Sequence, residues 1–184
     1  MPTEIKSKKG LLKAHRDCSD EVRTFFEYIP KLIDEFPMHV CLAYVFSRME
    51  LGQNMALYCG TVKLFRANSE IAKSAVGTHH MTREEFVRLY KTIYGFDLPE
   101  TAAKDLKVAE RTRDLIMHGK NSTDENIRNA IARVLEYAEE VNTHLSTKFK
   151  IKPFGSLKGF SGRAKKLDKK TTRYMLKGMG FSIS

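Results

Sequence analysis

Two residues in the second half of the chain, Arg113 and His118, have side chains suited to phosphate and acid–base chemistry. Histidine exchanges a proton near neutral pH, and arginine presents a rigid fork that matches a phosphate. Asp114 lies four residues before His118, so on a helix its carboxylate can orient the imidazole and favour the protonated form. These groups supply what metal-free RNA cleavage needs: an acid/base for the 2′-hydroxyl or leaving oxygen, and a cation for the pentavalent phosphate.

A helix predicted over residues 100–118 places Arg113 inside its own apolar stripe. The other members of that stripe are Ala102, Leu106, Ala109 and Ile116. A guanidinium in such a stripe is costly unless it is paired or faces a cleft. Arg111 falls on the opposite face and is ordinary. A purely structural interpretation stays open, in which Arg113 pairs with a buried carboxylate and His118 is only a cation capping the helix end.

The segment Arg113-Asp-Leu-Ile-Met-His118 resembles the Arg-x4–6-His signature of the HEPN superfamily, in which a polar residue commonly follows the arginine. Members are α-helical bundles that often dimerise, and in many of them two motifs face each other to form one ribonuclease site. The resemblance extends loosely over residues 19–147. It implies that Arg113 and His118 are catalytic, with Asp114 in support, and that the chain forms a homodimer.

The same resemblance implies a metal-independent endoribonuclease with a toxin, defence or RNA-processing role, and an antitoxin or other protein as a partner. One departure from the family concerns Gly119-Lys120, which follow the histidine where some toxin members carry a tyrosine two residues on. Other members have lost catalysis. The alternative is therefore a catalytically silent helical module that binds nucleic acid, or an acidic protein partner, through its basic tail.

Hydrophobic periodicity predicts an all-α fold, a helical bundle of five or six helices without strands. The first helix begins near Ser19 and should be kinked or split at Pro30. A buried second helix covers roughly residues 38–58, and Gly60 is expected to separate it from a helical stretch around 61–75.

Two capping boxes mark later helix starts, Thr82 with Glu85 and the segment Ser122-Thr-Asp-Glu125. Gly95 and Gly119 mark two helix ends. The last helix of the bundle has the clearest apolar pattern in the chain: Ile127, Ile131, Val134, Ala138, Val141 and Leu145.

The domain plan expected from composition has three parts: a polar lead-in over residues 1–18, the bundle over 19–149, and a basic, glycine-containing tail over 150–184. Residues 148–184 hold 11 lysines and arginines against one acidic residue, whereas residues 1–147 hold 21 of each sign. A neutral body with a basic appendage points to an anionic partner such as RNA. The predicted nucleic-acid-binding residues are Lys158, Arg163, Lys165, Lys166, Lys169, Lys170 and Arg173.

Other functional classes find little support in the sequence. There is no apolar run long enough for a membrane span and no apolar core of a signal peptide, and three unpaired cysteines fit a reducing cytoplasm. His79-His80 has no third ligand nearby, so no metal or other cofactor is expected. Two further interpretations of the tail remain open: it is a solvated segment, or it is a docking segment for an acidic partner.

Overall fold

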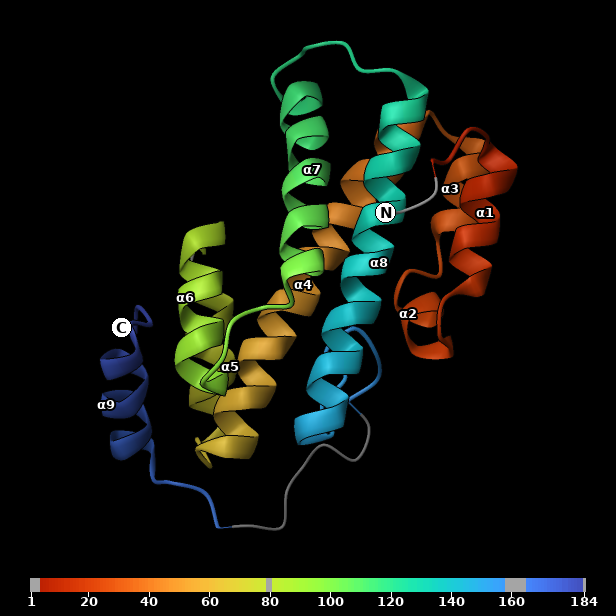
Figure 1. The fold of residues 1–184 in the computed structure, drawn as a ribbon. Helices are drawn as coiled ribbons and strands as arrows, with labels where there is room; N and C mark the ends of the chain where they lie inside the picture. Colours follow the sequence, from red (N-terminus) through yellow and green to blue (C-terminus); the bar gives the residue numbers. More distant parts are fainter. Residues whose placement is uncertain (1–3, 79–80, 158–164, 184) are drawn as a thin grey trace. The chain divides into compact units, whose positions relative to one another are not determined.

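The computed structural model describes residues 4–78, 81–157 and 165–183. Within these ranges the chain forms nine α-helices and no strand, which confirms the all-α class (Figure 1). The helix count exceeds the five or six expected, because short helices flank and subdivide the predicted ones. The helices are α1 (Lys8–Asp17), α2 (Asp20–Phe25), α3 (Ile29–Glu35), α4 (Met38–Leu64), α5 (Ser69–Thr78), α6 (Arg83–Tyr94), α7 (Glu100–Met117), α8 (Asp124–Phe149) and α9 (Lys169–Met179).

The chain divides into two compact units, and each unit is made of two separate stretches of sequence. Unit 1 comprises Met1–Leu51 and Pro99–Ser156, and unit 2 comprises Gly52–Leu98 and Leu157–Ser184. One boundary falls inside α4. These boundaries differ from the expected ones at residues 18 and 149, because segments distant in sequence complete each unit.

Unit 1 is built around the antiparallel pair α7 and α8, joined by a loop over residues 118–123 (Figure 1). The predicted stripe of α8 is buried throughout, and α1 and α2 pack against the same helix. The N-cap of α8 is Thr123, whose side chain accepts a hydrogen bond from the Asn126 amide, so the helix begins one residue later than a cap at Ser122 requires.

The expected polar lead-in contains a packed helix. Ser7 caps α1 by accepting a hydrogen bond from the Gly10 amide, and Leu11 and His15 are buried. These two residues lie four apart on one face of the helix. The stripe is too short, and too interrupted by charges and Gly10, for periodicity to reveal it. The expected split of the first helix does occur, but at residues 26–28: α2 ends at Phe25, α3 starts at Ile29, and Pro30 lies in the first turn of α3.

The segment after α8 folds back into unit 1 instead of leaving it. Ile151 and Phe154 are fully buried, and the Phe154 ring lies edge-on to Phe25 and Tyr137. Asn142 on α8 holds this segment through the backbone of Phe154. The first residues of the expected tail are therefore part of the core of unit 1.

In unit 2, α4 continues through Gly60 to Leu64 rather than breaking there. A side chain at this position would overlap Ile93 of α6, and the hydroxyl of Tyr94 donates a 2.7 Å hydrogen bond to the Ala56 carbonyl. Glycine is thus required for close approach of α6 to α4, not for a helix end. The predicted capping box of Thr82 and Glu85 starts α6, and Gly95 ends it with a positive φ.

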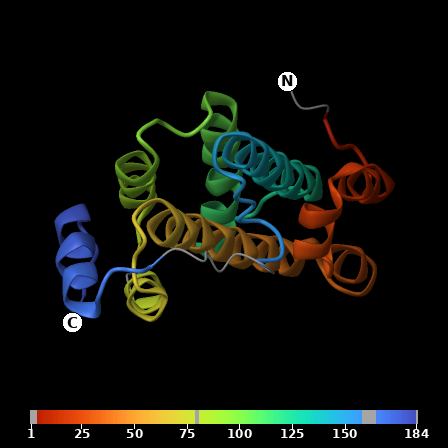
Figure 2. The ribbon, with the colours of Figure 1, turned by 90° about the horizontal axis from the view of Figure 1, so that it is seen from below.

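The C-terminal helix α9 belongs to unit 2, where it packs against α5 and α6 (Figures 1 and 2). Asp168 caps it by accepting a hydrogen bond from the Thr171 amide. Thr172, Leu176 and Phe181 are buried. This part of the expected tail is consequently a docked helix.

Candidate functional site

The position of His118 is set by the way α7 ends. The Lys120 amide donates to the Leu115 carbonyl at 2.8 Å and the Gly119 amide to the Ile116 carbonyl at 3.0 Å, the two bonds of a Schellman cap. Gly119 takes a φ of 70°, which suits glycine. His118 is the C-cap residue and its side chain is exposed. The imidazole is therefore accessible to an incoming ligand.

Arg113 continues the stripe by which α7 packs. Ala102, Leu106 and Ala109 are buried as predicted, and the side chain of Arg113, the next position, is 32% exposed. Arg111 is exposed. The distinction that the sequence draws between the two arginines is thus present in the structure.

Three groups surround the guanidinium of Arg113. The Asp114 carboxylate accepts hydrogen bonds from Nε at 3.0 Å and Nη2 at 2.8 Å. Glu50 accepts a longer bond of 3.4 Å from Nη1, and the Phe46 ring lies 5.1 Å from the guanidinium carbon. The arginine is paired as its partial burial requires, but its carboxylate partners are exposed rather than buried.

Sequence reasoning did not find Phe46 and Glu50. They lie one turn apart on α4, so they present an aromatic face and a carboxylate to the same neighbour. The signal was weak because the first turns of α4 are apolar all round and Glu50 is an ordinary surface acid in sequence. Only the packing of α4 beside Arg113 gives the pair a role.

The expected pairing of Asp114 with His118 is not formed. The carboxylate of Asp114 turns to Arg113, and only its backbone carbonyl meets His118, accepting that residue's amide at 3.0 Å. Among the described residues, no hydrogen bond or ion pair holds the His118 imidazole. Asp114 therefore supports the arginine of the motif, and the histidine is free to turn toward a ligand.

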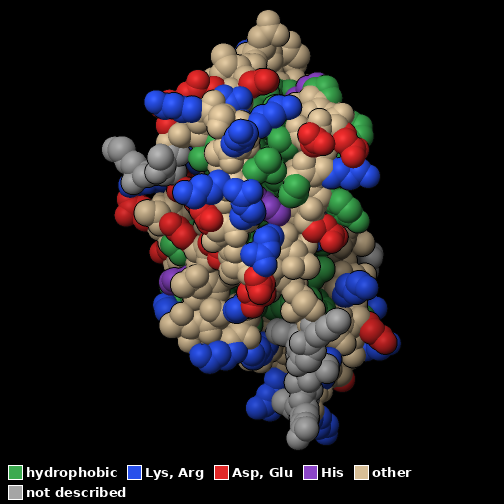
Figure 3. Space-filling view, turned by 90° about the vertical axis from the view of Figure 1, so that its right-hand side faces the viewer, with side chains coloured by type: hydrophobic (Ala, Val, Ile, Leu, Met, Phe, Trp, Pro, Cys, Tyr) green, Lys and Arg blue, Asp and Glu red, His purple; other side chains and the backbone are tan. Residues whose placement is uncertain are grey.

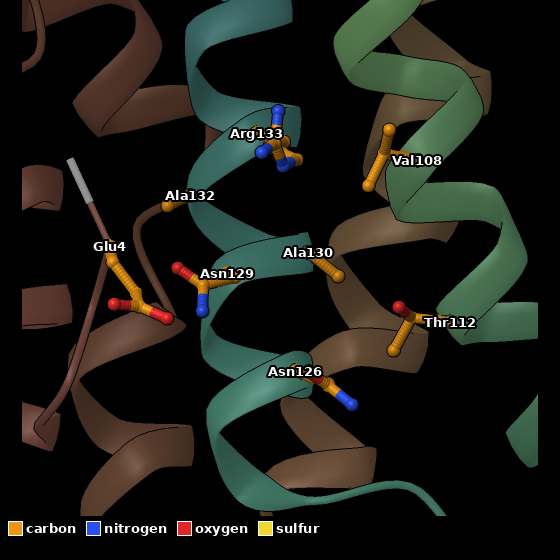
Figure 4. A pocket seen from close by; sticks show the side chains of 8 residues that line it. All are labelled: Glu4, Val108, Thr112, Asn126, Asn129, Ala130, Ala132 and Arg133. Atoms are coloured by element: carbon orange, nitrogen blue, oxygen red, sulfur yellow. The ribbon is translucent and has the colours of Figure 1, made fainter. Parts of the chain in front are cut away.

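A cavity of about 300 Å³ in unit 1 is lined by residues of α7 and α8 (Figure 4). Its walls are formed by Glu4, Val108, Thr112, Asn126, Asn129, Ala130, Ala132 and Arg133. Figure 4 shows Val108 and Thr112 on α7 facing Ala130 and Asn126 on α8. Arg133 forms an ion pair with Asp105, so its charge is already compensated. Neither Arg113 nor His118 lines the cavity, which we do not assign to the motif.

Five of the predicted nucleic-acid-binding residues are described by the structure and lie in unit 2, whereas Arg113, Asp114 and His118 lie in unit 1. Lys165 and Lys166 precede α9, and Lys169, Lys170 and Arg173 lie on it. All but Lys166 are exposed. Lys158 and Arg163 fall outside the described residues. The structure thus joins Arg113 and Asp114 by hydrogen bonds and leaves the His118 side chain apart from both, and α9 carries three of the described basic residues.

On the face drawn in Figure 3, basic side chains are interspersed with acidic ones and do not merge into one large patch. Burial raises the pKa of the Cys18, Cys41 and Cys59 thiols to about 12, so none is a ready nucleophile. In the part of the chain that the structure describes, no three His, Cys, Asp or Glu side chains gather as metal ligands. His79 and His80 lie outside it.

None of the helices in the described ranges has both the length and the apolar character that a membrane crossing demands. Comparisons of the chain with protein-family models, with curated proteins and with solved structures found no match.

Proposed function

We propose that this chain is a metal-independent endoribonuclease of the HEPN type, with Arg113 and His118 as its catalytic residues and Asp114 as the residue that positions Arg113. One observation carries the proposal. Within unit 1, a guanidinium is held on α7 by Asp114, Glu50 and the Phe46 ring, and an unengaged imidazole lies five residues later at the exposed end of the same helix.

The chemistry needs only the substrate's own nucleophile. The ribose 2′-oxygen attacks the adjacent phosphorus, the bond to the 5′-oxygen breaks, and a 2′,3′-cyclic phosphate and a 5′-hydroxyl result. One proton leaves the 2′-hydroxyl and one is added to the leaving oxygen, and His118 can perform either transfer. Arg113 stabilises the additional negative charge on the pentavalent phosphate. Its contacts with Asp114 and Glu50 keep the fork in one orientation before substrate arrives.

A single histidine serves only one of the two proton transfers at a time. A two-fold dimer that brings two α7 ends together supplies one histidine as base and the other as acid, with two arginines around one phosphate. We therefore propose a homodimer as the active form, in a toxin, defence or RNA-processing role in the cytoplasm. An antitoxin or other protein that covers the α7 ends would regulate it.

A second candidate is a catalytically silent helical module that binds nucleic acid or an acidic protein. The observation that favours it is the pairing of Arg113 with two carboxylates, which compensates the charge that a phosphate would meet. Both candidate functions include RNA as a ligand. An RNA cleavage assay distinguishes them, because only the endoribonuclease cleaves the RNA that it binds.

The test is cleavage of single-stranded RNA in the presence of EDTA, with the ends of the products identified. We expect a cyclic phosphate end, and a loss of rate of at least about 100-fold in His118→Ala and in Arg113→Ala. Arg111→Ala is the matched control, because it removes the same charge from the other face of α7 and should retain most of the rate.

Circular dichroism of each variant verifies that helicity is unchanged. Equal cleavage by the wild type and both alanine variants would show that the site is assigned wrongly. Binding without any cleavage would favour the silent module. Sedimentation at micromolar concentration should show a dimer, and a monomer that cleaves RNA would contradict the shared site.

A further inference from the structure

Helix α9 divides its side chains sharply between two faces. Thr172 and Leu176 are buried, and Met179 is half-buried, so one face at a spacing of four and three residues packs on unit 2. At about 100° per residue, Lys170, Tyr174 and Lys177 lie on the opposite side and Arg173 lies on the flank next to them, and all four are exposed. The helix therefore has one anchoring face and one basic face with a tyrosine in it.

The anchoring face is fixed by hydrogen bonds as well as by apolar packing. The Asn68 amide donates to the Thr172 hydroxyl at 3.0 Å, and the Leu167 amide donates to the Arg66 carbonyl at 2.8 Å. At the other end of α9, Arg88 Nη1 donates to the Met179 carbonyl at 3.1 Å. Because both ends are tied to unit 2, a ligand would meet a preformed surface and would not have to order it.

No acidic side chain lies within α9 to compensate the outer cations. The preceding Asp168 is engaged by the amide and the hydroxyl of Thr171. Glu70 of α5 reaches Lys169 at 2.9 Å, at the edge of the basic arc. Lys170, Arg173 and Lys177 are in no ion pair among the described residues. Three cations are thus left for an external anion.

The charge of the whole chain is concentrated in the same unit. The stretches that form unit 2 contain 14 lysines and arginines against 5 acidic residues, whereas those of unit 1 contain 18 against 17. Nearly all of the net charge of +10 therefore belongs to unit 2. Such an imbalance attracts a polyanion and accelerates its association.

We infer that the outer face of α9 is a binding surface for single-stranded RNA, separate from the residues that cleave it. Lys170, Arg173 and Lys177 contact phosphates along about 10 Å of helix, and the Tyr174 ring stacks on an unpaired base. The inference deepens the proposed function and rests on it for RNA as the substrate, because it names the surface that holds that substrate.

Tyr174 favours RNA over an acidic protein partner. Its side chain is 67% exposed between the cations, although tyrosine carries a large apolar ring. A base offers a flat apolar surface to such a ring together with a phosphate for each neighbouring cation. Binding of an acidic peptide would require only the cations and would not require the Tyr174 ring.

Binding is measured with the full chain carrying His118→Ala, so that the probe is not cut. The probe is a labelled, unstructured RNA of about 16 nucleotides, at several salt concentrations. Replacing Lys170, Arg173 and Lys177 together by Gln should weaken binding at least about tenfold and lower the log–log salt slope by about 2, at roughly 0.7 for each phosphate contact.

The matched control replaces Lys9, Lys13 and Arg16 by Gln. These residues are exposed on α1 of unit 1 and span the same separation of seven positions along a helix, so the same charge is lost from the other unit. The control should change affinity far less than the α9 variant. Equal affinity and equal salt slope in the two triple variants would overturn the inference.

Tyr174 is tested in the same assay. Tyr174→Ala should weaken binding by about 5- to 150-fold, the range for loss of one stacked base, whereas Tyr174→Phe should retain it. Competition by polyglutamate as strong as that by RNA, with no effect of Tyr174→Ala, would assign the surface to an acidic protein and refute the RNA role. Because RNA affinity is measured separately from cleavage, an absence of nuclease activity in the wild type would leave this result interpretable.

Discussion

Asn142 and Phe154 exchange two hydrogen bonds through the side chain of one and the backbone of the other. The Asn142 amide nitrogen donates to the Phe154 carbonyl, and the Phe154 N–H donates to the Asn142 oxygen, both at 2.9 Å. Both residues are buried. One side chain thereby satisfies a backbone donor and a backbone acceptor that have left the regular helix.

Asn142→Ala should lower the free energy of unfolding of unit 1 by about 2–4 kcal/mol, because it leaves a buried donor and a buried acceptor without partners. Urea denaturation measures the loss. Asn126→Ala on the exposed side of the same helix is the control and should change stability by less than about 0.5 kcal/mol. Similar losses of unfolding free energy in the two variants would mean that residues 150–156 contribute little to the stability of the unit.

The same contacts predict that truncation after Lys148 destabilises unit 1, contrary to what composition suggests.

Gly60→Ala should destabilise unit 2 by about 1–3 kcal/mol, because a methyl group there overlaps Ile93 and lies 2.9 Å from Tyr94 Cζ. Hydrogen exchange of the α6 amides measures the effect. Gly77→Ala in α5 is the counterpart: a Cβ there meets nothing within 4 Å, so the change should be neutral or stabilising by up to about 1 kcal/mol. If Gly77→Ala were more destabilising than Gly60→Ala, the result would contradict the close approach of α4 and α6.

Asp114→Asn distinguishes support of Arg113 from support of His118. If the carboxylate positions the guanidinium, cleavage should fall by about 10- to 100-fold with no shift in the pH at which the rate changes. If it instead acted on the imidazole, the acid or basic limb of the pH–rate profile would move. Glu50→Gln, which removes the more distant carboxylate, should have the smaller effect. A shifted limb with little loss of maximal rate would contradict the structural assignment.

His15 should make stability depend on pH. Burial lowers its pKa below the ordinary 6.5, and the Arg23 charge acts in the same direction, against hydrogen bonds with the backbone of Arg23 and Phe26. Its Nε2 is buried without a hydrogen-bond partner among the described residues, so a proton there is unfavourable.

The unfolded chain binds this proton more readily than the folded one does. The contribution of His15 to stability is therefore complete above about pH 6.5 and is lost as the pH falls from there toward the lowered pKa. His15→Leu should reduce this pH dependence, and exposed His39→Gln should not. His144, whose pKa burial also lowers, accounts for part of the remaining slope. If His15→Leu left the dependence of stability on pH unchanged, the assignment of this dependence to His15 would be wrong.

Local signals in the sequence were sufficient for most helix ends. Thr82 with Glu85, Gly95, Gly119 and Asp168 each act through hydrogen bonds to residues a few positions away, so their effect is visible in a short window. The prediction for Gly60 was wrong because its reason lies in α6, more than thirty residues later. Local propensity could not reveal a close approach of two helices.

In the candidate site, too, local features could be predicted from the sequence, whereas contacts between distant residues could not. The position of Arg113 in the α7 stripe follows from helical spacing alone, and its side chain is partly buried in the structure. Its partner Glu50 is 63 residues away in sequence, and no periodicity connects the two. Helical spacing allows the Asp114 carboxylate to contact either Arg113 or His118. Which of the two it contacts depends on side-chain orientation, which spacing leaves open.

The discontinuous composition of each unit has a consequence for synthesis of the chain. Unit 1 needs Phe154 and unit 2 needs Leu176 and Phe181, whose buried positions complete the two cores. Neither unit can close while only the first half of the polypeptide has left the ribosome, although translation generally favours folding from the N-terminus. A nascent chain that has reached residue 156 already holds Arg113 and His118, but it lacks α9. During translation, the proposed cleavage residues therefore emerge before the proposed substrate-holding helix.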